Sequence, residues 1–180
     1  MTQQVTIPPH GAALRALHWG SALLVVAAWV VGITMDGVPR GPARGVAMQV
    51  HYSLGVLVLG FAALRVVRYA MAPAVSEGPV WQRVSAAAMH WALLGMTVGV
   101  PLTGLLDRWA RGRAVAVFGG LELPAPFAVP GGKMWGGAHE MLAWALAVAV
   151  AAHVAAALWH QLVLRDGTLA RMLPRRASVA

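Results

Sequence analysis

The chain of 180 residues carries few charges for its length. Hydrophobic residues make up 59% and charged residues 11%, whereas an average soluble domain is about 25% charged. The sequence has no cysteine, which excludes disulfides, thioether-linked haem and cysteine-bound iron–sulfur clusters. A net charge of +8 lies mostly between and beyond the apolar segments, which favours membrane topology and lipid contact over nucleic-acid binding.

Four apolar segments each reach the roughly 20 residues that a membrane-spanning helix needs. Glycine and proline break the connections between them, and the third connection, residues 107–137, is long and rich in both. The first segment is preceded by Pro8 and Pro9 and has no signal-peptidase motif, so we expect it to be retained. The sequence predicts one integral membrane domain over residues 1–180, an all-α bundle of four transmembrane helices. The predicted spans are residues 13–35, 46–67, 84–106 and 138–164.

Lysine and arginine counts predict the orientation. With a cytoplasmic N-terminus, the inner side carries eight of these residues and the outer side carries six. The inner side also holds the cluster Arg171, Arg175 and Arg176. The positive-inside rule then predicts that both termini are cytoplasmic.

Histidines recur at two depths of the predicted bundle. In the fourth span, His139 and His153 are fourteen residues apart, which in an α-helix is within about 40° of the same face and about 21 Å along the axis. His51, early in the second span, falls at the outer depth of His139. His18, near the inner end of the first span, falls at the inner depth of His153.

Matched depths predict two ligand pairs, His51 with His139 and His18 with His153. A six-coordinate haem takes one imidazole on each side of its ring, so these four residues are predicted to ligate two b-type haem irons. His90 opens the third span at the inner depth and is an alternative to His18. A single histidine in a span more often bonds a neighbouring helix, but four in matched pairs favour haem. Zinc is disfavoured because the two pairs are too far apart to share one ion.

Short motifs lie along nearly the whole chain. They are Leu17-His18-Trp19, His51-Tyr52-Ser53-Leu54-Gly55, Val100-Pro101-Leu102-Thr103-Gly104, His139-Glu140, His153 to His160 and the tail Asp166 to Pro174. Together these motifs resemble bacterial cytochrome b561. The resemblance implies four helices that hold two b-type haems at the positions of His18, His51, His139 and His153. The best-described member of that family oxidises superoxide outside the membrane and reduces ubiquinone, so a bacterial inner membrane, a superoxide donor and a ubiquinone acceptor are also implied.

The long outer connection is basic. It carries Arg108, Arg111, Arg113 and Lys133 against Asp107 and Glu122. Positive potential near a haem edge would gather a small anion such as superoxide, and we predict that Arg108, Arg111 and Lys133 guide it. Solvated charge, or contact with haem propionates and lipid, is the alternative.

Three further residues are predicted to bind cofactors. Arg65 lies fourteen residues after His51, at the inner haem depth, where it either pairs with a propionate or anchors the span at the inner surface. His90 and His160 lie near the inner surface, where a histidine can hydrogen-bond a quinone carbonyl or carry its protons. Interfacial side chains without that role are the alternative.

Two rival functions remain open at the level of the sequence. One is an anchor subunit that passes electrons between a partner dehydrogenase or hydrogenase and quinone. The other is a haem protein with a structural or sensory role. The expected partners are membrane lipid, quinone and superoxide, and the anchor-subunit alternative adds a redox protein.

Overall fold

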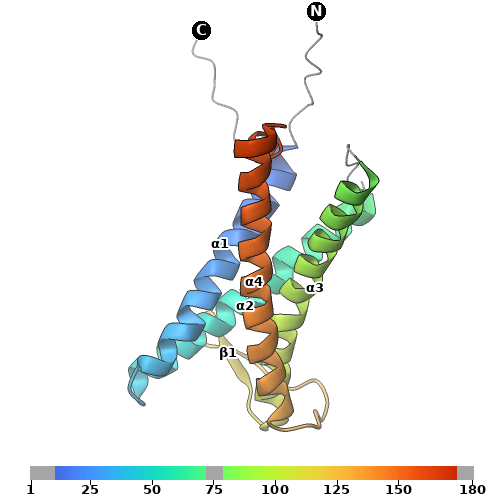
Figure 1. The fold of residues 1–180 in the computed structure, drawn as a ribbon. Helices are drawn as coiled ribbons and strands as arrows, with labels where there is room; N and C mark the ends of the chain where they lie inside the picture. The colour runs from blue at the N-terminus through green and yellow to red at the C-terminus, as the bar shows by residue number, and fades with distance from the viewer. Residues whose placement is uncertain (1–10, 72–78, 174–180) are drawn as a thin grey trace, which may run out of the picture.

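The computed structural model describes residues 11–71 and 79–173 and consists mainly of four long helices (Figure 1). All four helices are long and apolar enough to cross a membrane, which confirms the predicted bundle. Helices α2 and α3 extend beyond the predicted spans, because the backbone hydrogen bonds of a helix do not require apolar side chains and continue past the apolar run. The helices are α1 (Ala12–Thr34), α2 (Pro42–Met71), α3 (Val80–Ala110) and α4 (Met134–Trp159).

The connection between α3 and α4 contains a short β-hairpin that the sequence analysis did not predict. Strand β1 (Val115–Val117) pairs antiparallel with β2 (Leu121–Leu123), with Val117 opposite Leu121. Gly119 lies between them with φ of 82°, a conformation that suits glycine in a three-residue hairpin loop. The side chains of Val115 and Val117 are fully buried, so the hairpin packs into the fold instead of extending from it.

Helix packing is close between sequence neighbours. The closely packed pairs are α1 with α2, α2 with α3, and α3 with α4, and β1 packs against α2 and α3. Large apolar side chains are exposed on every helix, among them Leu23, Val66, Trp91 and Val148, as a surface in contact with lipid requires. Within the described residues few apolar side chains are buried, among them Val58, Ala62, Leu94, Val115, Val117 and Leu146.

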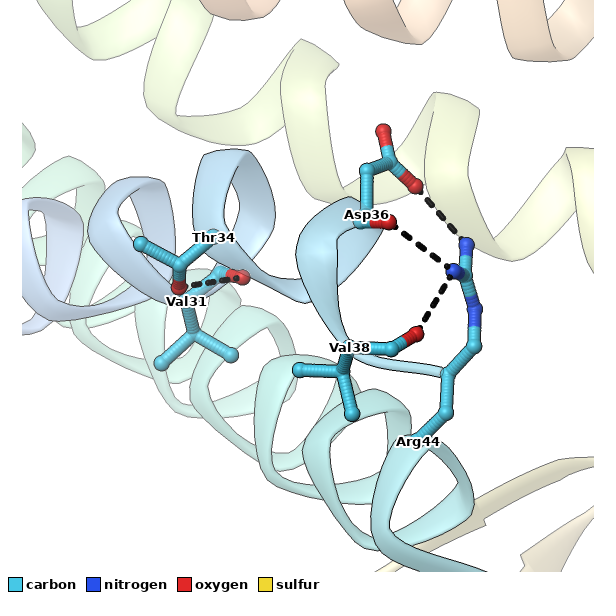
Figure 2. Close-up of polar contacts among 5 residues, drawn as sticks. All are labelled: Val31, Thr34, Asp36, Val38 and Arg44. Carbon is cyan, nitrogen blue, oxygen red and sulfur yellow. Dashed lines mark hydrogen bonds and ion pairs between the residues drawn. The ribbon is translucent and has the colours of Figure 1, made fainter. Parts of the chain in front are cut away.

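A polar turn joins α1 to α2. Figure 2 shows Arg44 donating to Asp36 and to the carbonyl oxygen of Val38, with 2.8 Å between the Arg44 guanidinium and an Asp36 carboxylate oxygen. The turn itself is η1 (Met35–Gly37), and Thr34 donates to the carbonyl oxygen of Val31 just before it. The Arg44 bonds satisfy carbonyl groups of the turn that follows α1, those of Asp36 and Val38.

The molecule has two distinct ends (Figure 1). The hairpin end holds β1, β2 and the start of α4. The terminal end holds the start of α1, the start of α3 and the end of α4, which continues as a π-helical turn, η2 (His160–Leu164), and a short 3-10 turn, η3 (Ala170–Met172).

Candidate functional site

Helix α4 carries two of the predicted residues at different depths. His139 lies near its first turn at the hairpin end, and His153 lies near its last turns at the terminal end. The intervening residues are regular α-helix, so the fourteen-residue separation corresponds to about 21 Å along the axis. Each histidine is half-buried. Groups bound at His139 and at His153 would therefore occupy different levels of the bundle.

At the hairpin end, the imidazole of His139 faces that of His51 on α2. The ring centroids are 6.0 Å apart and the ring planes are at 89°. Nδ1 of His51 lies 2.9 Å from the carbonyl oxygen of Ala28, and Nδ1 of His139 lies 2.8 Å from that of Val100. A carbonyl oxygen only accepts, so each Nδ1 carries the proton and each Nε2 keeps its lone pair. This is the tautomer in which a histidine ligates a metal through Nε2.

Two glycines give these rings their space. A Cβ at Gly32 of α1 would lie 3.1 Å from Cε1 of His51, and a Cβ at Gly104 of α3 would lie 3.1 Å from both Cε1 and Nδ1 of His139. Contacts that short would force the ring to shift. Glycine at these positions lets α1 and α3 approach the imidazoles closely enough for their carbonyl groups to accept the Nδ1 hydrogen bonds.

At the terminal end, His153 faces two histidines from different helices. The ring of His18 on α1 lies 6.2 Å from it, and the ring of His90 on α3 lies 5.7 Å from it, measured between centroids. The structure thus brings both the predicted partner and its alternative to His153. Arg65 of α2 is close enough for its charge to act on His153, which puts this arginine at the depth that the sequence predicts.

The geometry of both ends fits haem. A metal–imidazole bond of about 2 Å places two axial Nε2 atoms about 4 Å apart and their ring centroids about 6 Å apart. The separations of 6.0 Å and 6.2 Å for the two predicted pairs agree with that value. The described part of the chain has no cluster of three or more histidine or carboxylate groups arranged around a single ion. Paired imidazoles on facing helices suit a flat macrocycle better than a compact metal cage.

A pocket of about 220 Å³ opens beside the hairpin-end pair. Tyr52, the residue after His51, lines it together with Gln49, Arg108 and Arg113. The Arg108 guanidinium carbon lies 5.4 Å from the centroid of the Tyr52 ring, and its Nη2 donates to the carbonyl oxygen of Ala114. Nε of Arg108 is buried and has no hydrogen-bond partner in the described residues. The pocket therefore offers the fixed cation of Arg108.

The other predicted guiding residues lie outside this pocket lining. Arg111 forms a bidentate ion pair with Asp107, at 2.6 Å for the shortest contact, and that hydrogen bond raises the pKa of the arginine. Its charge is largely compensated by its neighbour. A Cβ at Gly136 would lie 2.8 Å from Asp107, so α4 packs closely against this ion pair. Lys133 precedes α4 and is exposed.

The terminal end has a polar network after α4. Nδ1 of His160 bonds one carboxylate oxygen of Asp166, and the other oxygen accepts from the backbone N–H and the hydroxyl of Thr168, at 3.0 Å and 2.6 Å. Partial burial raises the pKa of Asp166, but these hydrogen bonds outweigh it and hold the pKa at about 2. Arg171 donates to the Thr168 hydroxyl, and Nε1 of Trp19 donates to the carbonyl oxygen of Met172. The network fixes the segment after α4 against α1.

Two residues of these sites received no role from the sequence. Tyr52 and Asp166 both lie inside motifs that carry the family resemblance. The Asp-Gly-Thr order after the fourth span is a signal for an aspartate that hydrogen-bonds the backbone two residues on, and Asp166 does so with Thr168. Tyr52 has no such local signal, because its partner Arg108 comes from another helix.

Four membrane-length helices with facing imidazoles at two levels define the class of membrane-bound b-type cytochromes. The chain matches the prokaryotic cytochrome b561 family over residues 9–175, and it belongs to that family. It is accordingly a b-type cytochrome and an electron carrier of a bacterial membrane.

Named relatives extend over almost the full chain. Cytochrome b561 homolog 2 of Escherichia coli (strain K12) is 30% identical over 94% of this chain and 93% of the relative. The probable superoxide oxidase CybB of Yersinia pestis is 29% identical over 89% of this chain and 93% of the relative. Cytochrome b562 of Cereibacter sphaeroides is 29% identical over 98% of this chain and 100% of the relative.

Proposed function

We propose that this protein is a di-haem electron carrier that oxidises superoxide at the hairpin end and reduces ubiquinone at the terminal end. The observation that carries the proposal is the presence of facing imidazoles at both ends of α4, at separations that suit axial ligands. His51 and His139 hold one haem, and His18 and His153 hold the other. A relative named a probable superoxide oxidase supports the choice of electron donor.

Haem b supplies reversible one-electron chemistry when bound. The chain's own contribution begins with the ligand tautomer: the carbonyl groups of Ala28 and Val100 keep Nε2 of His51 and His139 deprotonated and directed to a metal. His51 and His139 would hold the haem from opposite sides and leave its iron no free position for oxygen. The haem would then supply electron transfer without binding oxygen.

The pocket beside Tyr52 is the proposed approach for superoxide. Arg108 and Arg113 line it, and positive potential in a confined site raises the local concentration of an anion. Superoxide loses one electron and becomes dioxygen, so the step breaks no bond and needs no proton. Arg111 and Lys133 add to the positive potential around the pocket in this proposal.

The terminal end is the proposed site of quinone reduction. His90 lies beside His153, and His160 is the residue that directly follows α4, with its side chain 30% exposed. Both imidazoles are proposed to bond a quinone oxygen near the membrane surface. Arg65, whose charge acts on His153, is proposed to pair with a haem propionate there.

The proposed orientation puts the hairpin end outside the cytoplasm and both chain termini inside. This places the basic pocket where extracytoplasmic superoxide has access and the His160 segment on the cytoplasmic side. The excess of lysine and arginine on the terminal side supports that arrangement.

Rapid mixing of the purified, oxidised protein with superoxide tests the proposal. We expect two haems per chain, reduced by superoxide within the mixing time and reoxidised by added ubiquinone. Haems that superoxide does not reduce, but that accept electrons from quinol or from a co-purifying dehydrogenase, would contradict the proposed function.

That second result would support the anchor-subunit function, for which the hairpin end offers one specific observation. Phe118, Leu121 and Phe127 are more than half exposed there, at 54%, 56% and 63%. Exposed aromatic and aliphatic side chains on a loop beside a haem edge suit a docking protein. Recovery of a defined redox subunit with the tagged chain from native membranes distinguishes the two functions.

A further inference from the structure

The segment that follows α4 brings His160 and Asp166 together by an unusual path. In a regular α-helix, residues six apart lie about 120° from each other around the axis. Here the helix widens into the π-turn η2, and Arg165 then adopts a left-handed conformation with φ of 53°. Few residues other than glycine adopt that conformation. The reversal returns the Asp166 carboxylate to Nδ1 of His160.

Both oxygens of the Asp166 carboxylate are occupied in the structure. One accepts the Nδ1–H of His160, and the other accepts two bonds from Thr168. Among the described residues the imidazole is therefore held through Nδ1 alone, and Nε2 is the nitrogen from which a proton can move. The side chains of His160 and Asp166 are 30% and 39% exposed, so water has access to them.

The same segment lies beside the terminal-end histidines. Trp19 is the residue after His18, and the two rings are 5.3 Å apart. Nε1 of Trp19 also bonds the carbonyl oxygen of Met172 at 2.8 Å, which fixes the segment close to His18. Gln161 Oε1 and Arg171 Nε are buried in it, and neither has a hydrogen-bond partner in the part of the chain that the structure describes. Gln161 Oε1 can accept a hydrogen bond from the hydroxyl of a quinol, and Arg171 Nε can donate one to the carbonyl of a quinone.

We propose that Asp166 is a positioning residue that orients His160 as the proton donor to quinone at the terminal end, an inference that rests on the proposed quinone reduction. Quinone takes two electrons and two protons to become quinol, and under the proposed function two superoxide anions supply the electrons and become two dioxygen molecules. For each proton, the His160 imidazolium gives its Nε2–H to a quinone oxygen while Nδ1–H remains hydrogen-bonded to Asp166. The neutral imidazole then regains a proton from the aqueous phase.

The test measures haem reoxidation after rapid mixing of the reduced holoprotein in lipid nanodiscs with a short-chain ubiquinone. Asp166→Asn and His160→Gln are expected to slow this phase by about a hundredfold, the lower range of general acid catalysis. Reoxidation by ferricyanide, which takes electrons without protons, is expected to stay at the wild-type rate. Reduction by superoxide at the other end should also be unchanged.

Asp36→Asn is the matched control, because it makes the same chemical change in a carboxylate that is ion-paired with Arg44 (Figure 2). Asp36 lies in the turn that follows α1, and α1 runs away from the terminal end (Figure 1). This variant should leave the rate of haem reoxidation by the short-chain ubiquinone unaffected. Thr168→Val removes one hydrogen bond from the Asp166 carboxylate and gives a milder variant if Asp166→Asn does not fold. A smaller slowing, with a larger solvent deuterium isotope effect than in the wild type, is expected from it.

Haem reoxidation by quinone at the wild-type rate in the folded variants would overturn the inference. Equal slowing with quinone and with ferricyanide would also overturn it, because the effect would then be on the haems and not on proton delivery. A wild-type protein that does not pass electrons to quinone at all would instead contradict the proposed function.

Discussion

The two ends of the bundle hold their histidines in different ways. At the hairpin end, His51 and His139 face each other, and each Nδ1 bonds a backbone carbonyl from a neighbouring helix. At the terminal end, His153 faces two imidazoles, from His18 and His90, at nearly the same distance. One end has a single pair in a fixed tautomer, and the other has three rings around a shared position.

Under the proposed function, this difference separates holding a cofactor from exchanging with a substrate. Carbonyl bonds, close glycines and a buried hairpin strand surround the rings at the hairpin end, which suits the proposed electron transfer from a small anion. The terminal end combines the third histidine with the hydrogen-bonded segment after α4. A site that reduces quinone needs such additional titratable groups, because protons accompany the electrons.

The largest expected effect comes from removing a ligand at the rigid end. His139→Ala should eliminate the hairpin-end haem and leave the terminal-end haem in place, since no second imidazole faces His51 among the described ring contacts. Haem content per chain and the low-temperature α-band measure this result. Loss of both haems, or of neither, would contradict the pairing.

A second pair of variants tests which histidine completes the terminal end. His18→Ala is expected to remove the haem bound by His153, whereas His90→Ala should retain that haem and slow its reoxidation by ubiquinone. The rings of both residues lie about equally far from His153, so these variants separate ligand from neighbour. If His90→Ala removed the haem and His18→Ala retained it, His90 would be the ligand and His18 the neighbour.

Substitutions in the basic region distinguish the pocket from its surroundings. Arg108→Gln is expected to lower the rate constant for reduction by superoxide about tenfold, the lower end of electrostatic steering. Arg111→Gln removes the same charge but from an ion pair with Asp107, so a smaller effect is expected. Stopped-flow measurements at two ionic strengths check both, and an equal loss in the two variants would argue against a specific pocket.

The smallest effect concerns the glycine beside His139. Gly104→Ala places a Cβ 3.1 Å from the ring and is expected to lower stability by about 1–3 kcal/mol through overpacking. Gly95→Ala in the same helix meets nothing within 4 Å and should raise stability by about 0.4–1 kcal/mol. Thermal unfolding of the holoprotein in detergent measures the pair, and equal shifts would show that the close contact at Gly104 has no energetic consequence.

The sequence by itself determined the four spans and the depth of each histidine. Span length follows from the thickness of the hydrocarbon core, and depth follows from a helical rise of 1.5 Å per residue, both of which are local quantities. That is why the predicted bundle is confirmed and why His51 with His139, and His18 with His153, come together at two levels. Asp107 and Arg111 form an ion pair over a spacing of four residues, which is likewise a local feature of the sequence.

Only the tertiary structure decided which groups surround those histidines. The carbonyls of Ala28 and Val100 belong to neighbouring helices, and Arg108 reaches Tyr52 because α3 packs against α2. The hairpin between α3 and α4 gains its stability from burying Val115 and Val117 in the bundle. Its strands have three residues each, too few for an alternating pattern that would predict them from the sequence. His160 meets Asp166 only because the chain leaves regular helical geometry at η2 and Arg165. Such contacts depend on where separate elements lie in space, which spacing along one chain does not specify.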